Sequence, residues 1–171
     1  HIRSDEVEQV LALAGEPLGD FFRAYNALSN ADLKFEDAVT ENGSAREVGQ
    51  SSINSLITNK DRSVRKSGFE HYADGYLAYK NSLSSIQLGQ LHRDAFNARN
   101  RNYPSSLEAA LSNNNIPPAV FHALIDTFRK HLPTWHRYWK VRKEAMRVDT
   151  FHVYDIKAPL SDHSPEIPFE Q

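Results

Sequence analysis

A proline-free stretch from position 61 to 99 is the strongest constraint on the fold of this 171-residue chain. Large apolar and aromatic residues recur in it at alternating steps of three and four, the spacing of one helix face. These residues are Phe69, Tyr72, Tyr76, Tyr79, Leu83 and Ile86. A single helix over this stretch would measure roughly 58 Å, longer than a compact domain of this size is wide. We therefore expect a long helix with a break near Gly89, because glycine lowers helical stability.

Shorter helical patterns flank this stretch. Ser4 is placed to cap a helix that Gly15 would end, and a second helix is expected over residues 18–28. Ser51 or Ser52 would open a short helix, and Ser105 or Ser106 would open another over residues 107–111.

The last helical pattern begins at Pro117 and Pro118, since proline suits the first turn of a helix. Its apolar face continues to Leu132, and Pro133 either kinks this helix or begins the next one. Apolar residues then recur up to Met146.

One β-hairpin is expected near residues 33–48. Asn42-Gly43, the strongest short hairpin signal in the chain, separates residues 38–40 from residues 45–48. The predicted fold class is therefore mostly α, a multi-helical lobe with long helices and one small β-hairpin. We expect residues 1–150 to form this lobe and residues 151–171, which carry three prolines, to be an extended linker.

Composition excludes several classes of protein. The chain has no Cys, so disulfide frameworks and thiolate metal sites are excluded and a reducing, cytoplasmic location is expected. No apolar run is long enough to span a bilayer, and we expect no membrane association. The net charge of −2 makes nucleic-acid binding an unfavoured function.

Few residues carry a pattern typical of catalysis or metal binding. His131 and His136 are five positions apart and cannot share a metal on one helix, and His71 with Asp74 makes a single pair. The histidine–glutamate–x–x–histidine pattern of zinc helices, a serine elbow and a glycine-rich phosphate loop are all missing from the sequence. We assign no catalytic residue and no metal ligand, and the residues that bind substrate stay unassigned.

Residues 129–147 leave an alternative open. They contain seven Lys or Arg and one Glu, interleaved with aromatic residues that could stack on bases. The simpler interpretation is an amphipathic helix whose aromatic residues face a core while its cations are solvated. The alternative is a free-standing helical binding module with this basic aromatic helix as its contact surface.

The order of several short motifs is more informative than any one of them. They are Asn30-Ala-Asp-Leu-Lys-Phe35, Asp61-Arg62 with Arg65, Tyr79-Lys80-Asn81, Arg101-Asn-Tyr103, Ser106-Leu-Glu-Ala-Ala-Leu111, Ile116-Pro117, His131-Leu-Pro-Thr-Trp-His-Arg-Tyr138, Arg142-Lys143 and Tyr154-Asp-Ile-Lys-Ala-Pro-Leu160. In this order and spacing, from His1 to Leu160, the chain resembles the oligoendopeptidase F family of zinc metallopeptidases, relatives of thimet oligopeptidase.

The resemblance implies a role within a larger enzyme. Such peptidases are large, mostly helical, clam-like proteins whose deep cleft admits short peptides. Their zinc is held by a histidine–glutamate–x–x–histidine helix and a further Glu, downstream of the region that this chain resembles. We therefore expect a non-catalytic internal segment, with no zinc of its own, that shapes the substrate cleft. Its partners would be the remaining part of the parent peptidase and, through the cleft, short peptides.

Apolar residues of the long stretch also predict an interaction. Val64, Leu77, Leu88 and Leu91 are displaced from its main stripe, so both sides of the helix demand cover. A segment separated from its parent would expose such residues. We therefore expect the chain to self-associate or to bind the rest of its parent.

Overall fold

Two compact units make up the chain in a computed structural model, which describes residues 2–161. One unit contains residues 1–33 and 79–131, and the other contains residues 34–78 and 132–171. Helices dominate both, and the two-stranded sheet lies in the second unit. The prediction of a mostly α fold with one small β-hairpin is confirmed. The expected boundary between a lobe and a linker at residue 150 stays a prediction.

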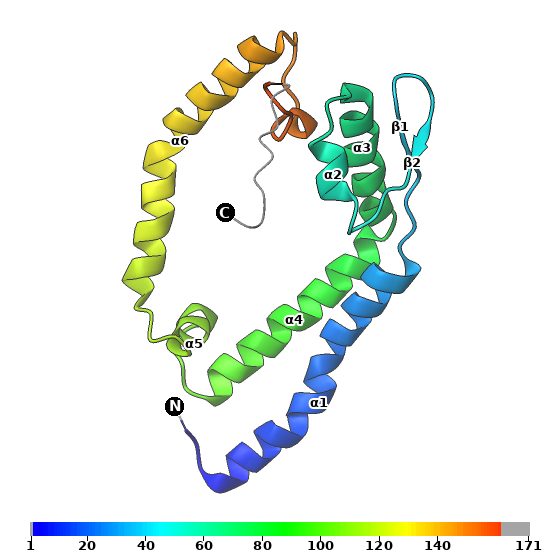
Figure 1. Cartoon of the computed structure of the whole chain (residues 1–171). Coiled ribbons are helices and arrows are strands. Elements are labelled where there is room, and N and C mark those ends of the chain that lie inside the picture. The colour runs from blue at the N-terminus through cyan, green and yellow to red at the C-terminus, as the bar shows by residue number, and fades with distance from the viewer. Residues whose placement is uncertain (1, 162–171) are drawn as a thin grey trace, which may run out of the picture. The chain divides into compact units, whose positions relative to one another are not determined.

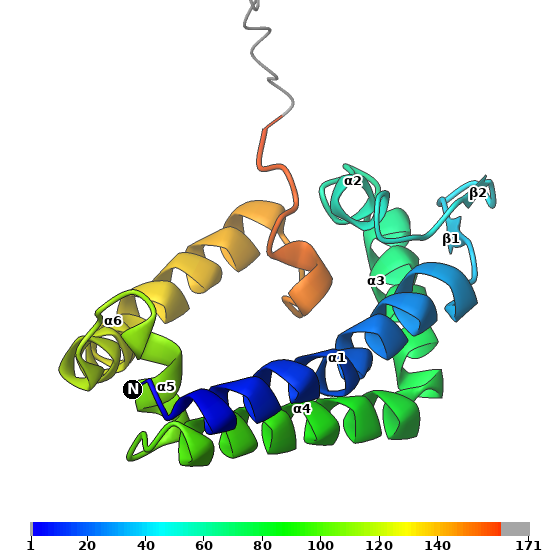
Figure 2. The same cartoon turned by 90° about the horizontal axis from the view of Figure 1, so that it is seen from below.

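An antiparallel helix pair forms the body of the first unit. Helix α1 (Asp5–Ala27) and helix α4 (Lys80–Asn100) lie side by side in both views (Figures 1 and 2). An ion pair joins their ends, with Arg101 Nη1 2.9 Å from Glu8 Oε1, and Arg3 donates to the carbonyl of Asn100 at 2.8 Å. A π-helical turn at Leu28–Asp32 follows α1.

The expected end of the first helix at Gly15 is wrong, because α1 continues through Gly15 and Pro17. Gly15 and Pro17 are both exposed, and no atom outside the local helix lies close to Gly15. Pro17 has no N–H to donate to the carbonyl of Leu13. Because Leu13 is exposed, water can donate to that carbonyl instead. The two helices expected over residues 4–28 are therefore one.

The break expected near Gly89 is also misplaced. Helix α3 (Arg62–Ala78) ends at Tyr79, whose φ of −107° and ψ of 18° are not helical, and α4 starts at the next residue. Gly89 lies inside α4 and faces α1, where a side chain would overlap the ring of Phe21. Glycine at this position serves close helix packing rather than a break in the helix.

The β-hairpin and two helices build the core of the second unit. Strands β1 (Ala38–Val39) and β2 (Ala45–Arg46) pair antiparallel with Ala38 opposite Arg46, and Gly43 in the turn has a φ of 83°. Both the hairpin and the short helix after Ser52, α2 (Ile53–Ile57), are confirmed. The buried core consists of Ala38, Val48, Leu56 and Val64, with Phe35 and Tyr72 packed against it.

Two further helices follow α4. The N-cap of α5 (Ser106–Ser112) is Ser105, whose hydroxyl accepts the N–H of Glu108 at 3.1 Å, as the sequence predicts. Helix α6 (Pro118–Met146) is continuous through Pro133, so the alternative in which Pro133 begins a new helix is wrong. Pro133 has no N–H, so the carbonyl of Arg129 lacks its helical donor. Both residues are exposed, and water can satisfy that carbonyl.

Residues 151–161 differ from the expected extended conformation. Val153–Asp155 form a 3-10 turn (η2), and Tyr154, Asp155 and Ala158 are buried. The prolines at 165 and 168 lie outside the described residues. No helix in the described part of the chain is both long and apolar enough to cross a membrane.

Candidate functional site

A buried carboxylate and three arginines form a polar cluster in the second unit. The Asp155 side chain is 0% exposed, and both its oxygens accept hydrogen bonds. Arg62 Nη2 lies 2.8 Å from Oδ2 and Arg62 Nε lies 3.1 Å from Oδ1. Arg65 Nη2 lies 3.0 Å from Oδ1, and the backbone N–H of His152 donates to Oδ2 at 3.1 Å. We call Arg62, Arg65, Arg142 and Asp155 the arginine–aspartate cluster.

The two buried arginines, Arg65 and Arg142, bind backbone carbonyls. Arg65 Nη1 donates to the carbonyls of Asn59 and Lys60 at 2.8 and 2.9 Å. Arg142, at the end of α6, donates to the carbonyl of Ala158 and, at 3.4 Å, to that of Asp155. The cluster therefore ties α3 and the last turns of α6 to residues 152–158.

Charge in the cluster is stable at neutral pH. Burial raises the pKa of Asp155, but the hydrogen bonds from Arg62, His152 and Arg65 outweigh it and lower that pKa to about 2. The hydrogen bond to Asp155 likewise raises the pKa of Arg62. A carboxyl with so low a pKa stays ionised at neutral pH, so it is not suited to be a general acid or base there. Its role is to hold chain segments together.

The histidines considered from the sequence lie apart from this cluster. His131 and His136 are exposed on α6. His71 Nδ1 lies 2.9 Å from the carbonyl of Asp37, and its Nε2 lies 3.9 Å from the carboxylate of Glu36. Within residues 2–161, no three His, Cys, Asp or Glu side chains are grouped in a way that could hold a metal ion.

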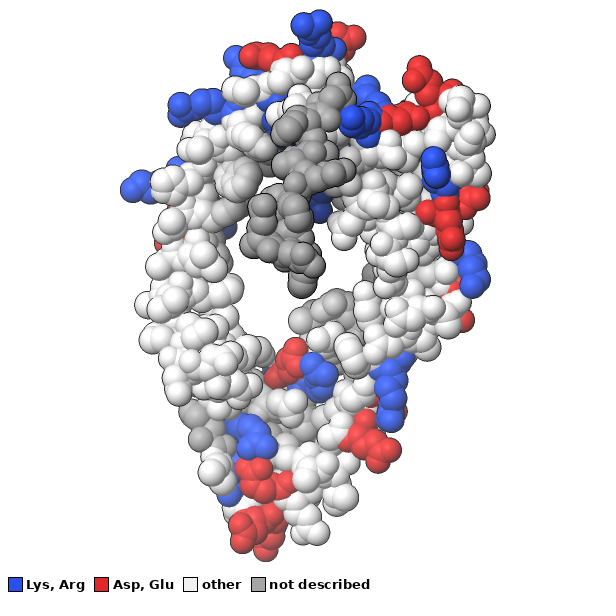
Figure 3. Space-filling view, viewed as in Figure 1, with Lys and Arg blue, Asp and Glu red and all other residues white. Residues whose placement is uncertain are grey.

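The basic aromatic helix 129–147 is less buried than the amphipathic interpretation requires. Trp135 and Tyr138 are 44% and 46% exposed, whereas Trp139 and Met146 are half-buried. Lys and Arg side chains are scattered among uncharged ones over the upper end of α6 (Figure 3). Arg142 is the exception among these cations, since it is buried in the arginine–aspartate cluster.

Helix α6 also exposes apolar side chains along most of its length. Leu124 and Phe128, for example, are 68% and 55% exposed. We call four exposed residues in the part of α6 that belongs to the first unit the α6 apolar surface: Val120, Phe121, Leu124 and Phe128. Of the residues expected to need cover on the long stretch, Leu77, Leu88 and Leu91 are exposed, and Val64 is instead part of the core.

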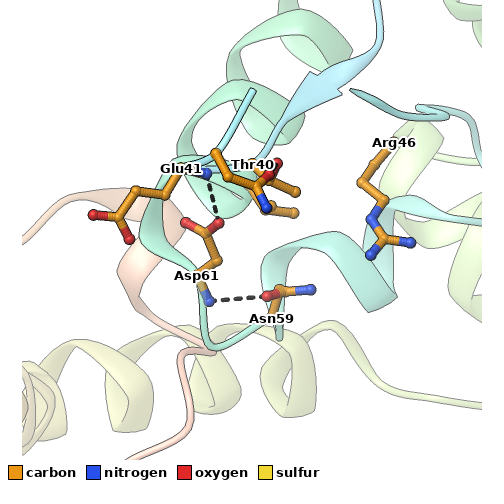
Figure 4. A pocket seen from close by; sticks show the side chains of 7 residues that line it. Thr40, Glu41, Arg46, Asn59 and Asp61 are labelled. Atoms are coloured by element: carbon orange, nitrogen blue, oxygen red, sulfur yellow. Dashed lines mark hydrogen bonds between the residues drawn. The ribbon is translucent and has the colours of Figure 1, made fainter. Parts of the chain in front are cut away.

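A polar pocket of about 460 Å³ lies between the hairpin and the connection from α2 to α3 (Figure 4). Asp61 fixes its geometry: the carboxylate accepts the N–H groups of Glu41 and Ser63, each at 2.8 Å, and its own N–H donates to Asn59 Oδ1 at 2.9 Å. The N–H of Glu41 is the main cause that lowers the pKa of Asp61, so this carboxylate is ionised at neutral pH. Arg46 lines the opposite side of the pocket.

Sequence reasoning missed the convergence of its own motifs. Asp61-Arg62 with Arg65, Arg142-Lys143 and the segment that starts at Tyr154 are among the motifs of the resemblance, and four of their residues meet in the arginine–aspartate cluster. The available signal was a single charged residue between apolar ones, namely Asp155 between Tyr154 and Ile156.

Comparisons with known proteins agree with these motifs. Residues 55–171 match the model of "Peptidase family M3", and residues 1–35 match that of "Oligopeptidase F". The chain is 36% identical over its full length to oligopeptidase PepF of Bacillus subtilis (strain 168) and 30% identical to group B oligopeptidase PepB of Streptococcus agalactiae. Its structure matches that of oligoendopeptidase-F from Enterococcus faecium with a TM-score of 0.91 at 36% identity, over 97% of this chain.

All of these similar proteins are much longer. The chain spans 26% of the Bacillus protein, 28% of the Streptococcus protein and 32% of the Enterococcus chain. The similarity is therefore complete along this chain and partial along its relatives.

Proposed function

The chain belongs to peptidase family M3, and we propose that it is a non-catalytic helical segment of a longer, cytoplasmic, zinc-dependent oligoendopeptidase that hydrolyses short peptides. The observation that carries this proposal is the coverage: similarity to an oligopeptidase extends over 100% of this chain and only 26% of that relative. On this proposal, hydrolysis belongs to the rest of the longer protein.

Zinc does not fit the side chains of residues 2–161. A catalytic zinc needs three protein ligands, and this part of the chain contains no suitable group of three. The zinc of the proposed parent enzyme would be held by other residues, and no step of hydrolysis is assigned to the side chains of this segment.

The α6 apolar surface supports a partner within the same polypeptide. Leu124 and Phe128 are exposed and four positions apart, so they lie on one side of α6. Burial of such side chains contributes about 1.5–3 kcal/mol each. We propose that the remaining part of the parent peptidase covers this surface and that the segment then forms one wall of the substrate cleft.

Residues 151–171 complete the proposal, as the connection into the catalytic domain. Within them, Asp155 and Ala158 are held by Arg62, Arg65 and Arg142, so the connection starts from a fixed position in the second unit.

An exchange of segments tests the proposed function. The matching segment of Bacillus subtilis PepF is replaced with this chain, and hydrolysis of a short fluorogenic peptide is measured. The expected result is a folded, zinc-containing protein whose kcat/KM lies within about tenfold of that of unmodified PepF. A hybrid that folds and binds zinc but does not hydrolyse the peptide would overturn the proposal, as would hydrolysis by the 171-residue chain alone.

A second hybrid carries Leu124→Glu and Phe128→Glu as well, and a hybrid with Asp126→Glu is its control. If the remaining part of the enzyme covers the α6 apolar surface, these charges are buried at the interface and the hybrid loses stability and activity. Asp126→Glu, at an exposed position on the same helix, keeps the charge of that position and should leave both unchanged.

A second candidate function is a free-standing binding module, favoured by the exposure of Trp135 and Tyr138 among the cations of helix 129–147. Chromatography of the chain on immobilised single-stranded nucleic acid tests it. Retention that falls steeply with salt would support the module. Elution in the void volume at low salt would exclude the version that binds nucleic acid.

A further inference from the structure

The polar pocket between the hairpin and the α2–α3 connection has opposite charges on opposite sides. The carboxylate of Asp61 lies on one side and the guanidinium of Arg46 lies on the other, whereas the carboxylate of Glu41 points away from the pocket (Figure 4). Two different parts of the second unit supply the two facing charges: strand β2 and the residue before α3. The separation of charge is therefore a property of the fold of this unit.

The donors on the Arg46 side are not used by the protein, and one of them, the side-chain amide of Asn59, is held in place. Asn59 Oδ1 accepts the N–H of Asp61, which fixes the orientation of the amide and leaves its Nδ2 to face the Arg46 side of the pocket (Figure 4). Neither Asn59 Nδ2 nor the Arg46 guanidinium has a hydrogen-bond or ion-pair partner among residues 2–161. An amide N–H₂ beside a guanidinium is a donor set that suits a carboxylate.

The opposite side presents acceptors. Asp61 uses one lone pair of each oxygen for the N–H groups of Glu41 and Ser63, and each oxygen keeps a second lone pair. Asp61 and Arg46 carry opposite single charges, so the charges that face the pocket balance. That balance disfavours a simple anion, and it favours a ligand that brings an ammonium group as well as a carboxylate.

We propose that this pocket binds the zwitterion of a free amino acid or of a very short peptide. The carboxylate of the ligand binds Arg46 and Asn59, and its ammonium group binds Asp61. A volume of about 460 Å³ has room for a dipeptide, and the buried side chain of Val64 supplies an apolar part of the lining. The proposal does not depend on the peptidase function, because it rests on the lining of the pocket alone.

Nuclear magnetic resonance titration of the 171-residue chain tests this proposal. The side-chain amide of Asn59 and the Nε–H of Arg46 are followed while alanine or alanyl-alanine is added, so that the two spacings of charge are compared. Acetyl-alanine, which lacks the ammonium group, and alanine amide, which lacks the carboxylate, are added in parallel. We expect saturable shifts of both signals with at least one zwitterion, and binding about tenfold weaker for each blocked compound.

Variants separate a specific site from a general charge effect. Arg46→Gln should weaken the zwitterion by about tenfold, and Arg137→Gln, which removes an exposed charge from α6, should leave it unchanged. Unchanged amide signals elsewhere in the second unit would show that the Arg46 variant is folded. Equal affinity for alanine, acetyl-alanine and alanine amide, or equal affinity for the chain and its Arg46→Gln variant, would overturn the proposal, as would no shift at either signal.

Discussion

Arg65 and Asp155 are 90 positions apart in the sequence, and Arg65 Nη2 lies 3.0 Å from Asp155 Oδ1. The two side chains are 3% and 0% exposed, which makes theirs the one ion pair with both members buried in the described part of the chain. A buried ion pair adds little net stability over an apolar pair, but the loss of one member leaves an uncompensated charge. The main effect of this pair is therefore to fix the position of residues 152–158 against α3, and its net contribution to stability is small.

The first prediction concerns this pair. Asp155→Asn keeps the shape of the side chain and removes its charge, so Arg65 is left buried without a carboxylate. We expect the free energy of unfolding to fall by about 3 kcal/mol, at the lower end for a broken buried pair because Arg65 keeps two carbonyl acceptors. Urea denaturation followed by circular dichroism measures the change.

Arg62 provides the matched comparison. It binds the same carboxylate, but its side chain is 42% exposed. Arg62→Gln should therefore lower the free energy of unfolding by about 1 kcal/mol or less, because water can reach the position that Arg62 occupies. Equal losses for Arg62→Gln and Asp155→Asn would contradict the view that burial decides the energetics of the cluster.

The second prediction is a dependence of stability on pH. The pKa of Asp155 is lowered from 3.8 to about 2 in the folded chain. A lowered pKa means that the carboxylate contributes stability above its unfolded value, and that this contribution is lost as pH falls from about 4 towards 2. The loss amounts to about 2 kcal/mol.

Thermal unfolding at a series of pH values measures this loss. The Asp155→Asn variant should lack this component of the acid transition, whereas Asp126→Asn, at an exposed position on α6, should keep it. The same acid profile for all three proteins would show that other carboxylates cause the transition.

Local signals in the sequence predicted local structure well. Asn42-Gly43 placed the hairpin because its turn needs a residue with positive φ, and Gly43 has a φ of 83°. Ser105 was one of two adjacent serines predicted to cap a helix, because a capping hydroxyl needs only the N–H three residues later. The errors at Gly15 and Gly89 have the opposite origin. At Gly15, as at Pro133, where two alternatives were left open, the exposed helix continues through a residue that usually ends one. At Gly89 the reason is the ring of Phe21, 68 positions away.

The candidate sites were harder to predict than the fold. Arg62 and Asp155 belong to two of the family motifs. Because 93 positions separate them, no local sequence spacing indicates that they are in contact. The pocket depends on the orientation of one amide, Asn59, which is set by a hydrogen bond within the α2–α3 connection. Periodicity and capping rules describe neighbours in sequence, and they carry no information on such contacts.

The third prediction concerns self-association through the α6 apolar surface. Leu124 is 68% exposed, so Leu124→Glu should change the free energy of unfolding by no more than about 0.5 kcal/mol. If this surface drives association, the same change should reduce the average mass that sedimentation measures at micromolar concentration. A chain that is monomeric before and after the substitution would contradict the association, and Thr127→Glu, also exposed on α6, controls for added charge.

The fourth prediction concerns the contact between α1 and α4. An alanine at Gly89 would gain helical propensity of about 1 kcal/mol, but its methyl group would overlap three ring atoms of Phe21. Overpacking of this kind costs about 1–3 kcal/mol, so we expect Gly89→Ala to be destabilising on balance. Gly15→Ala is the matched control, since Gly15 is helical too and has open space around it. It should stabilise the chain by about 0.5–1 kcal/mol.

A double substitution shows whether the ring is the cause. Phe21→Ala removes the overlapping atoms, so in that background Gly89→Ala should become neutral or stabilising, and the two effects should not add. Thermal unfolding of the four proteins of this cycle gives the coupling between the two positions. A stabilising Gly89→Ala in the otherwise unchanged chain would mean that the two helices do not approach each other at Gly89, and close packing against Phe21 would then fail to explain the glycine inside α4.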